Sequence, residues 1–125
     1  MIGKTLSEYP LHLKIGTRPV GTVTVVDLSG PLTLGENSQS LRDGVNELVR
    51  KGQKRIVLNL AEVHYVDSSG LAAIVSSLAA ATRAGGNIKL LHLQKRVAEL
   101  VRITRLSSVL EAFSEESEAV QSFGA

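Results

Sequence analysis

The feature that most constrains the fold is a continuous apolar run that lies between two segments with helical periodicity. The run Ile56-Val57-Leu58-Asn59-Leu60 follows Arg55, and such a pattern is typical of a strand that helices cover on both faces of a sheet. Before it, residues 36–51 repeat apolar side chains on one helical face, and Gly52 stands where a helix usually ends. After it, residues 69–84 form an alanine-rich helical segment that ends at a Gly-Gly pair. Strands that alternate with helices predict crossover connections and a partly parallel sheet.

The remaining segments extend this pattern at both ends. Residues 11–15 and 20–28 are expected to form a hairpin, with a break at Thr17-Arg18-Pro19 between them. A strand is predicted over 88–93, a third helix over 97–104, and a short strand over 109–113. A last helix then follows, with Ser114 as its N-cap. The predicted class is α/β, in the order ββαβαβαβα, with a mixed β-sheet of about five strands and about four α-helices.

Composition limits both the domain organisation and the classes of function. The 125 residues suit one domain over 1–125, with residues 1–8 expected to be flexible. Aromatic residues make up 3% of the chain, so the core must be built from Val, Ile, Leu and Ala. The absence of cysteine excludes disulfides and thiolate metal sites and fits a reducing cytoplasm. No run of about 18 apolar residues and no signal-type leader is present, so we expect a cytoplasmic protein with no membrane segment.

The segment that carries chemistry lies between the buried strand and the alanine-rich helix. It reads Val66-Asp67-Ser68-Ser69-Gly70-Leu71. Aspartate and serine side chains accept hydrogen bonds from free N–H groups in the first turn of a helix. The helix dipole also tolerates negative charge at this end. The pattern is sufficient for a helix start, and it also displays a hydroxyl on a rigid corner where a phosphate can be carried.

Three segments together resemble the STAS family, and more narrowly the bacterial anti-sigma factor antagonists. They are I-V-L-N-L at 56–60, V-D-S-S-G-L at 66–71 and G-G-N-I-K-L-L at 85–91. The resemblance covers nearly the whole chain and implies a single STAS-like domain. Members are phosphorylated on the serine directly after the aspartate, which is Ser68 here. The expected partner-binding residues are Asp67, Ser68, Ser69, Gly70 and Leu71, with Asp67 shaping the corner and contributing to kinase recognition. Ser69 and Gly70 are expected to be structural, Gly70 by leaving room for a partner backbone.

The resemblance also implies a set of partners. The unphosphorylated antagonist would bind an anti-sigma factor that is itself a serine kinase with a GHKL-type ATP site, and this binding would free a sigma factor. Phosphorylation of Ser68 would release the antagonist, and a PP2C-type phosphatase would reset it. We expect a monomer with no cofactor, no metal and no catalytic residue. One position departs from the family: many members read G-x-L-D, whereas this chain reads Gly30-Pro31-Leu32-Thr33, so an acidic contact to the partner is in doubt.

Four other interpretations of the sequence compete with this one. A hydrolase built on Ser68, His64 and Asp67 lacks the G-x-S-x-G elbow, and its three residues lie within five positions. His12 and His92 show no metal-ligand spacing. The chain is alternatively a STAS subunit of a lipid-transport complex or of a stress-sensing assembly that does not use the phosphorylation switch. The last alternative is a nucleic-acid contact through the basic residues of the third helix, which are Lys95, Arg96, Arg102 and Arg105. The same residues could equally well flank a docking surface for an acidic partner.

Overall fold

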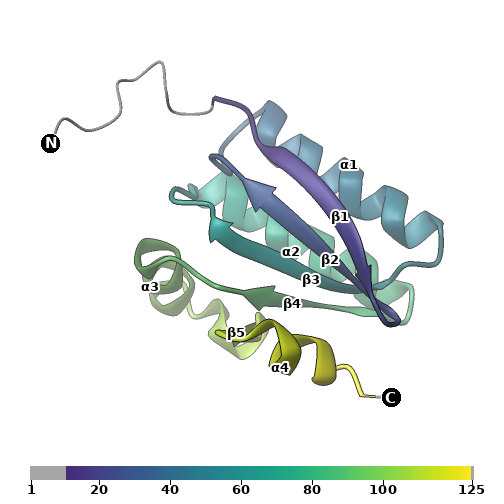
Figure 1. The fold of residues 1–125 in the computed structure, drawn as a ribbon. Helices are drawn as coiled ribbons and strands as arrows, with labels where there is room; N and C mark the ends of the chain where they lie inside the picture. Colours follow the sequence, from purple (N-terminus) through teal and green to yellow (C-terminus); the bar gives the residue numbers. More distant parts are fainter. Residues whose placement is uncertain (1–10, 125) are drawn as a thin grey trace, which may run out of the picture.

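One five-stranded sheet forms the centre of the structure, a computed structural model that describes residues 11–124 (Figure 1). The spatial order of the strands follows the chain, β1-β2-β3-β4-β5. β1 pairs with β2 in the antiparallel direction, and the other three pairings are parallel. The strands are β1 (Lys14–Val20), β2 (Val23–Ser29), β3 (Arg55–Glu62), β4 (Asn87–Leu91) and β5 (Ala112–Phe113).

Four α-helices lie among the described residues, and they cover the two faces of the sheet unequally. They are α1 (Glu36–Arg50), α2 (Ser68–Arg83), α3 (Lys95–Ile103) and α4 (Glu116–Gln121). Figure 1 shows α1 and α2 behind the sheet and α4 in front of it. The larger core cluster joins one face of the sheet to α1, α2 and α3, whereas a smaller cluster joins the other face to α4. The predicted order ββαβαβαβα in a mixed sheet is therefore confirmed. The expected flexibility of residues 1–8 lies outside the described residues.

β3 is buried on both faces, as its continuous apolar sequence predicts. Ile56 and Leu58 belong to the larger cluster, Val57 belongs to the smaller one, and all three are fully buried. β3 pairs with β2 on one side and with β4 on the other, which leaves no free edge. The helices on either side match their predicted ranges to within one residue. Both end before a glycine with positive φ, Gly52 (+85°) and Gly85 (+87°), because a left-handed residue closes a helix at little steric cost.

The predicted position of the hairpin turn is wrong. β1 continues through Thr17-Arg18-Pro19, and the turn lies at Gly21-Thr22, where Gly21 has a φ of +63°. Val20 pairs with Val23 directly across it. Proline usually interrupts a strand because it donates no ladder hydrogen bond, but β1 is the edge strand and one side of it needs no such bond. Pro19 is therefore accommodated inside the strand.

The C-terminal third also differs from the prediction in two details. The strand expected over 109–113 has only two residues, because a 3₁₀ turn at Leu106–Ser108 precedes it and Leu110 enters the core. Ser114 is not the N-cap of α4, since Glu115 takes that position, without a side-chain capping bond. α4 is instead held by contacts from the sheet, which are described below.

Candidate functional site

The candidate site lies at the ends of β2 and β3, where two loops run side by side. The loop after β2 and the loop after β3 form a parallel bridge between Leu32 and Val66. The Leu32 amide donates to the Tyr65 carbonyl at 3.0 Å, and the Asp67 amide donates to the Leu32 carbonyl at 3.3 Å. These bonds fix the start of α2 against the loop that leads into α1.

Asp67 is the N-cap of α2, and both of its carboxylate oxygens accept backbone bonds. Oδ1 accepts from the Gly70 amide at 2.8 Å, which satisfies a free N–H in the first turn of the helix. Oδ2 accepts from the Leu34 amide at 2.9 Å, across to the loop after β2. Asp67 thus ties the two loops together, as well as capping the helix. This agrees with its predicted role in shaping the corner.

Gly70 is buried because the helix backbone at this position nearly touches another segment of the chain. A Cβ added to Gly70 would lie 2.0 Å from the Leu32 carbonyl oxygen and 2.8 Å from the Leu32 carbonyl carbon. The room that glycine leaves is therefore filled by this chain's own loop, rather than by a partner backbone as we expected. The glycine of D-S-S-G allows α2 to begin directly against Leu32.

Ser68 and Ser69 occupy the first turn of α2, after the cap. The Ser68 side chain is exposed and Ser69 is half-buried, and neither hydroxyl makes a hydrogen bond within residues 11–124. Because Asp67 supplies the cap, helix capping does not explain the serine at position 68. Leu71 packs in the core with 5% of its surface exposed. Of the five residues expected at a partner surface, Ser68 is thus the most accessible, and Gly70 and Leu71 are buried.

Two recesses flank the exposed serine. One holds about 420 Å³ and lies between α2 and the α3 region; we call it the serine groove, and it is lined by Ser68, Leu71, Ala72, Val75, Ser76, Leu100, Thr104 and Leu106. The other holds about 230 Å³ and lies between the β3–α2 loop and α3; we call it the α3 recess, and it is lined by His64, Tyr65, Val66, Arg96, Val97, Glu99, Leu100 and Ile103. Leu100 lines both, so the two recesses are neighbours on one surface.

Thr33, which stands where the resemblance led us to expect an acidic residue, holds the start of α1 through hydrogen bonds. Its Oγ1 accepts a hydrogen bond from the Asn37 side-chain amide at 3.3 Å, and its carbonyl accepts from the Ser38 amide at 3.0 Å. The Asn37 Oδ1 in turn accepts from the Leu13 amide at 2.9 Å. Position 33 therefore braces the loop beside the corner and brings no negative charge to it.

The other residues considered from the sequence are not assembled into a reaction centre. The Asp67 carboxylate accepts hydrogen bonds from two backbone amides, and His64 lies 3.9 Å from Glu62. A Ser-His-Asp triad instead requires the histidine to be hydrogen-bonded to both the serine and the aspartate. His12 lies on the loop before β1, 3.9 Å from Glu36. Within residues 11–124, no three His, Asp or Glu side chains gather in a way that would hold a metal ion. No described helix is both long and apolar enough to cross a membrane.

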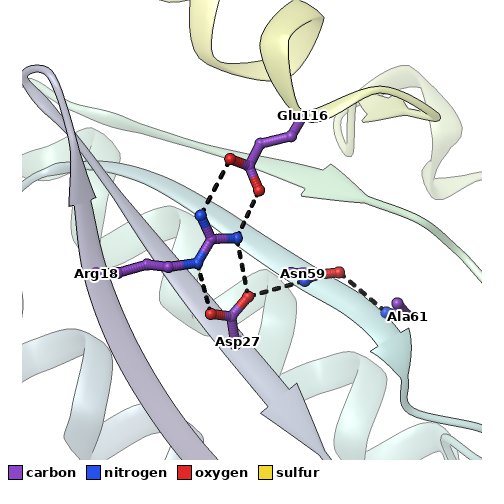
Figure 2. A network of polar contacts seen from close by, with 5 residues as sticks. All are labelled: Arg18, Asp27, Asn59, Ala61 and Glu116. Atoms are coloured by element: carbon purple, nitrogen blue, oxygen red, sulfur yellow. Dashed lines mark hydrogen bonds and ion pairs between the residues drawn. The ribbon is translucent and has the colours of Figure 1, made fainter.

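A polar network on the far side of the sheet was not predicted from the sequence (Figure 2). Arg18 lies between two carboxylates, with Nε donating to Asp27 at 2.7 Å and Nη1 donating to Glu116 at 3.0 Å. Asp27 also accepts from the Asn59 side-chain amide at 2.8 Å, and the Asn59 Oδ1 accepts from the Ala61 amide at 3.1 Å. The network joins β1, β2 and β3 to α4, across 98 residues of sequence between Arg18 and Glu116.

The network also shifts the pKa values of its members. The hydrogen bonds from Arg18 hold the pKa of Asp27 and that of Glu116 below their usual ranges, and the bonds to Glu116 and Asp27 raise the pKa of Arg18. All three groups therefore remain charged in the neutral range. The arrangement stabilises the fold and leaves no group free to exchange a proton near neutral pH.

Comparisons with known proteins agree with this geometry. A candidate anti-sigma factor antagonist of Thermotoga neapolitana is 31% identical over 87 residues, which is 69% of this chain and 77% of that protein. The crystal structure of the corresponding Thermotoga maritima protein superposes with a TM-score of 0.78 at 26% identity, covering 89% of this chain and 95% of that one. The anti-sigma factor antagonist SpoIIAA of Bacillus, solved in its unphosphorylated and phosphorylated forms, shares the fold, with TM-scores of 0.68 and 0.67 at 17% and 18% identity. Those superpositions include 87% of this chain and 96% or more of SpoIIAA.

A much longer relative matches over part of its length. A candidate sulfate transporter of Bacillus subtilis, YvdB, is 30% identical over 95 residues, which is 76% of this chain but only 18% of the transporter. The similarity to this relative is therefore confined to a small part of it. The STAS domain family model matches residues 14–119, which span all of β1 to most of α4. The chain therefore belongs to the STAS domain family.

Proposed function

We propose that this chain is an anti-sigma factor antagonist whose binding to an anti-sigma factor is switched off by phosphorylation of Ser68. The observation that carries the proposal is the exposed Ser68 hydroxyl in the first turn of α2, which has no capping role because Asp67 is the cap. Relatives that match across most of this chain are candidate anti-sigma factor antagonists. SpoIIAA, which shares the fold, has been observed with and without phosphate.

The position of Ser68 allows a phosphate to be added without unfolding the helix. The N-terminal turn of α2 carries the positive end of the helix dipole, so negative charge is tolerated there. The corner itself is held by backbone bonds between Leu32, Tyr65 and Asp67, and the serine takes part in none of them. Phosphorylation therefore changes the charge of the surface while the fold persists.

The same phosphate would strongly oppose a docked partner. It adds a charge of about −1.5 to −2 at neutral pH, beside the Asp67 carboxylate and at the mouth of a largely apolar groove. A partner packed over Ser68 would remove water from that charge, and the like charge of Asp67 lies next to it. A penalty of about 4 kcal/mol weakens binding roughly a thousandfold, which is sufficient for a switch.

The proposed partners follow from the family resemblance. The anti-sigma factor would be a serine kinase with a GHKL-type ATP site, and a PP2C-type phosphatase would remove the phosphate. The antagonist would act as a monomer in the cytoplasm, where sigma factors act, without contacting nucleic acid itself. It would catalyse no reaction, because the transfer of phosphate and its removal belong to the two partners.

The test measures binding between this chain and each purified GHKL-type kinase encoded in the same genome. Wild type and Ser68→Ala are expected to bind one kinase, and Ser68→Asp is expected to bind it at least tenfold more weakly. Ser117→Asp is the matched control, because Ser117 is exposed in the first turn of α4, on the other side of the sheet. With ATP present, mass spectrometry should place the phosphate on Ser68. Equal binding by Ser68→Ala and Ser68→Asp would refute the switch.

A second function, that of a STAS module in a larger transport or sensing assembly, is favoured by the match to YvdB. In that case Ser68 would not regulate binding. Capture of transporter or scaffold proteins to the same extent by wild type, Ser68→Ala and Ser68→Asp would support this second function. It would also exclude the antagonist mechanism for this chain.

A further inference from the structure

The α3 recess exposes apolar surface next to the proposed docking corner. Tyr65 and Ile103 line it, and they expose 54% and 61% of their surface, so two large exposed side chains lie in one hollow. The recess opens directly beside the corner, because Tyr65 and Val66 immediately precede Asp67. It also shares Leu100 with the serine groove. A partner seated over Ser68 would therefore reach the α3 recess without leaving the surface.

Positive charge is concentrated on α3 and on the residues that directly follow it. The segment 95–105 contains four basic residues and one acidic residue, a surplus of three, whereas the whole chain has a surplus of two. Within the α3 recess, Glu99 pairs with Arg102, and His64 lies 3.9 Å from Glu62. Arg96 is the basic side chain of the recess that forms no ion pair with any of residues 11–124. The recess thus combines an apolar floor with one unpaired guanidinium at its edge.

We infer that the α3 recess is the second half of the docking surface. Its occupant is a segment of the anti-sigma factor kinase that presents one large apolar side chain beside a carboxylate. The apolar side chain packs between Tyr65 and Ile103, and the carboxylate pairs with Arg96. Aromatic and arginine side chains are the residue types that most often dominate binding energy at interfaces, and an arginine holds a carboxylate with two parallel bonds. The inference rests on the proposed function and adds to it the chemistry of the partner's contact.

A protein partner fits this surface better than a nucleic acid does. Nucleic-acid surfaces present rows of unpaired basic groups that follow a phosphate backbone. Here Arg102 is already paired with Glu99, and Lys95 lines a different recess, together with His92 and Phe113. Arg105 follows the end of α3 and lines neither recess. Arg96 therefore offers a single guanidinium at an apolar hollow, which suits a single carboxylate next to an apolar side chain.

The test compares three variants against the kinase that binds Ser68→Ala, all made in the Ser68→Ala background so that phosphorylation cannot interfere. Arg96→Glu should weaken binding about 10–100-fold and remove most of its salt dependence, because the paired charge is reversed. Ile103→Ser should weaken binding about tenfold or more, with the salt dependence retained. Arg83→Glu is the matched control, since Arg83 is exposed in the last turn of α2, at the opposite end from Ser68, and it should bind as the parent does. Thermal melts should be unchanged in all three.

The outcomes separate this inference from the proposed function. If Ser68→Asp blocks binding while Arg96→Glu and Ile103→Ser bind like Arg83→Glu, the docking role of the recess is wrong and the switch stands. If Arg96→Glu and Ile103→Ser weaken binding while Ser68→Asp does not, the recess is a docking site and the switch is wrong. If no GHKL-type kinase binds, and a random-sequence RNA binds wild type but not Arg96→Glu, the surface contacts nucleic acid and both proposals are overturned.

Discussion

Replacing Gly70 by alanine tests the close approach that positions the candidate site. The added Cβ would lie 2.0 Å from the Leu32 carbonyl oxygen and 3.0 Å from Leu32 Cγ, whereas real Cβ contacts essentially never fall below 3.0 Å. The start of α2 must therefore move by about 1 Å, because a packed interior has no space to absorb the atom. That movement lengthens the bond from the Asp67 amide to the Leu32 carbonyl, which is already 3.3 Å long.

The size of the effect follows from three contributions. Overpacking costs about 1–3 kcal/mol. The weakened backbone bond costs about 1 kcal/mol more. The better helix propensity of alanine returns about 0.8–1.0 kcal/mol. We therefore expect Gly70→Ala to lower the free energy of unfolding by about 1–3 kcal/mol, measured by urea denaturation with the m-value compared to wild type.

Gly44→Ala is the matched control, because Gly44 also lies inside a helix but has room for a side chain. Its added Cβ would lie 3.8 Å from Ile15 Cδ1, an ordinary contact. This variant should be more stable than wild type by about 0.8–1.0 kcal/mol, from helix propensity alone. A Gly70→Ala protein that is as stable as Gly44→Ala would refute the reasoning, because it would mean that α2 does not approach Leu32 as closely as the structure shows.

Three further predictions concern the corner and the network on the far face. Asp67→Ala should lower stability by about 0.5–2 kcal/mol, because the helix loses its N-cap. It should also speed hydrogen exchange of the Leu34 and Gly70 amides, which donate to the carboxylate. Unchanged exchange would contradict the bridging role. Ser68→Ala should leave the urea midpoint within about 0.5 kcal/mol of wild type, because its hydroxyl is exposed and caps nothing; a larger loss would mean that the serine is structural. The lowered pKa values of Asp27 and Glu116 contribute stability that is fully present above the ordinary carboxyl range and is lost as the pH falls through their folded values. Arg18→Gln should therefore flatten the fall in stability as the pH drops below the ordinary carboxyl range, and an acid profile identical to that of wild type would show that the network is not formed in solution.

The sequence predicted the elements whose hydrophobic periodicity or capping residues lie within the element itself. An uninterrupted apolar run predicts β3, and apolar side chains on one helical face with a glycine after its end predict α1. The start of α2 was also visible, because Asp67 is a residue type that caps helices. In each case the deciding interactions lie within a few residues of one another.

The errors arose where a distant contact decides the structure. Pro19 is normally a strand breaker, and only the position of β1 at the sheet edge makes it acceptable. β5 is two residues long because a 3₁₀ turn and the buried Leu110 precede it, so that only Ala112 and Phe113 pair with β4. Gly70 was correctly singled out, but its neighbour proved to be Leu32, 38 positions earlier in the printed sequence. The contact between Arg18 and Glu116 left no local signal, because neither residue is unusual in its own segment.

The strand order β1-β2-β3-β4-β5 has a consequence for how the protein is made. Each strand leaves the ribosome next to the strand that it will pair with, so no strand has to insert between two that are already joined. Domains in which sequence neighbours make most of the contacts fold faster than those that wait for distant partners. The bridge between Leu32 and Val66 and the cap of α2 can form once residue 70 has emerged, before α4 is synthesised. The corner that carries Ser68 can therefore form early in synthesis, and the grooves beside it are completed when α3 follows, whereas the apolar valines on the opposite face stay uncovered until the last helix arrives.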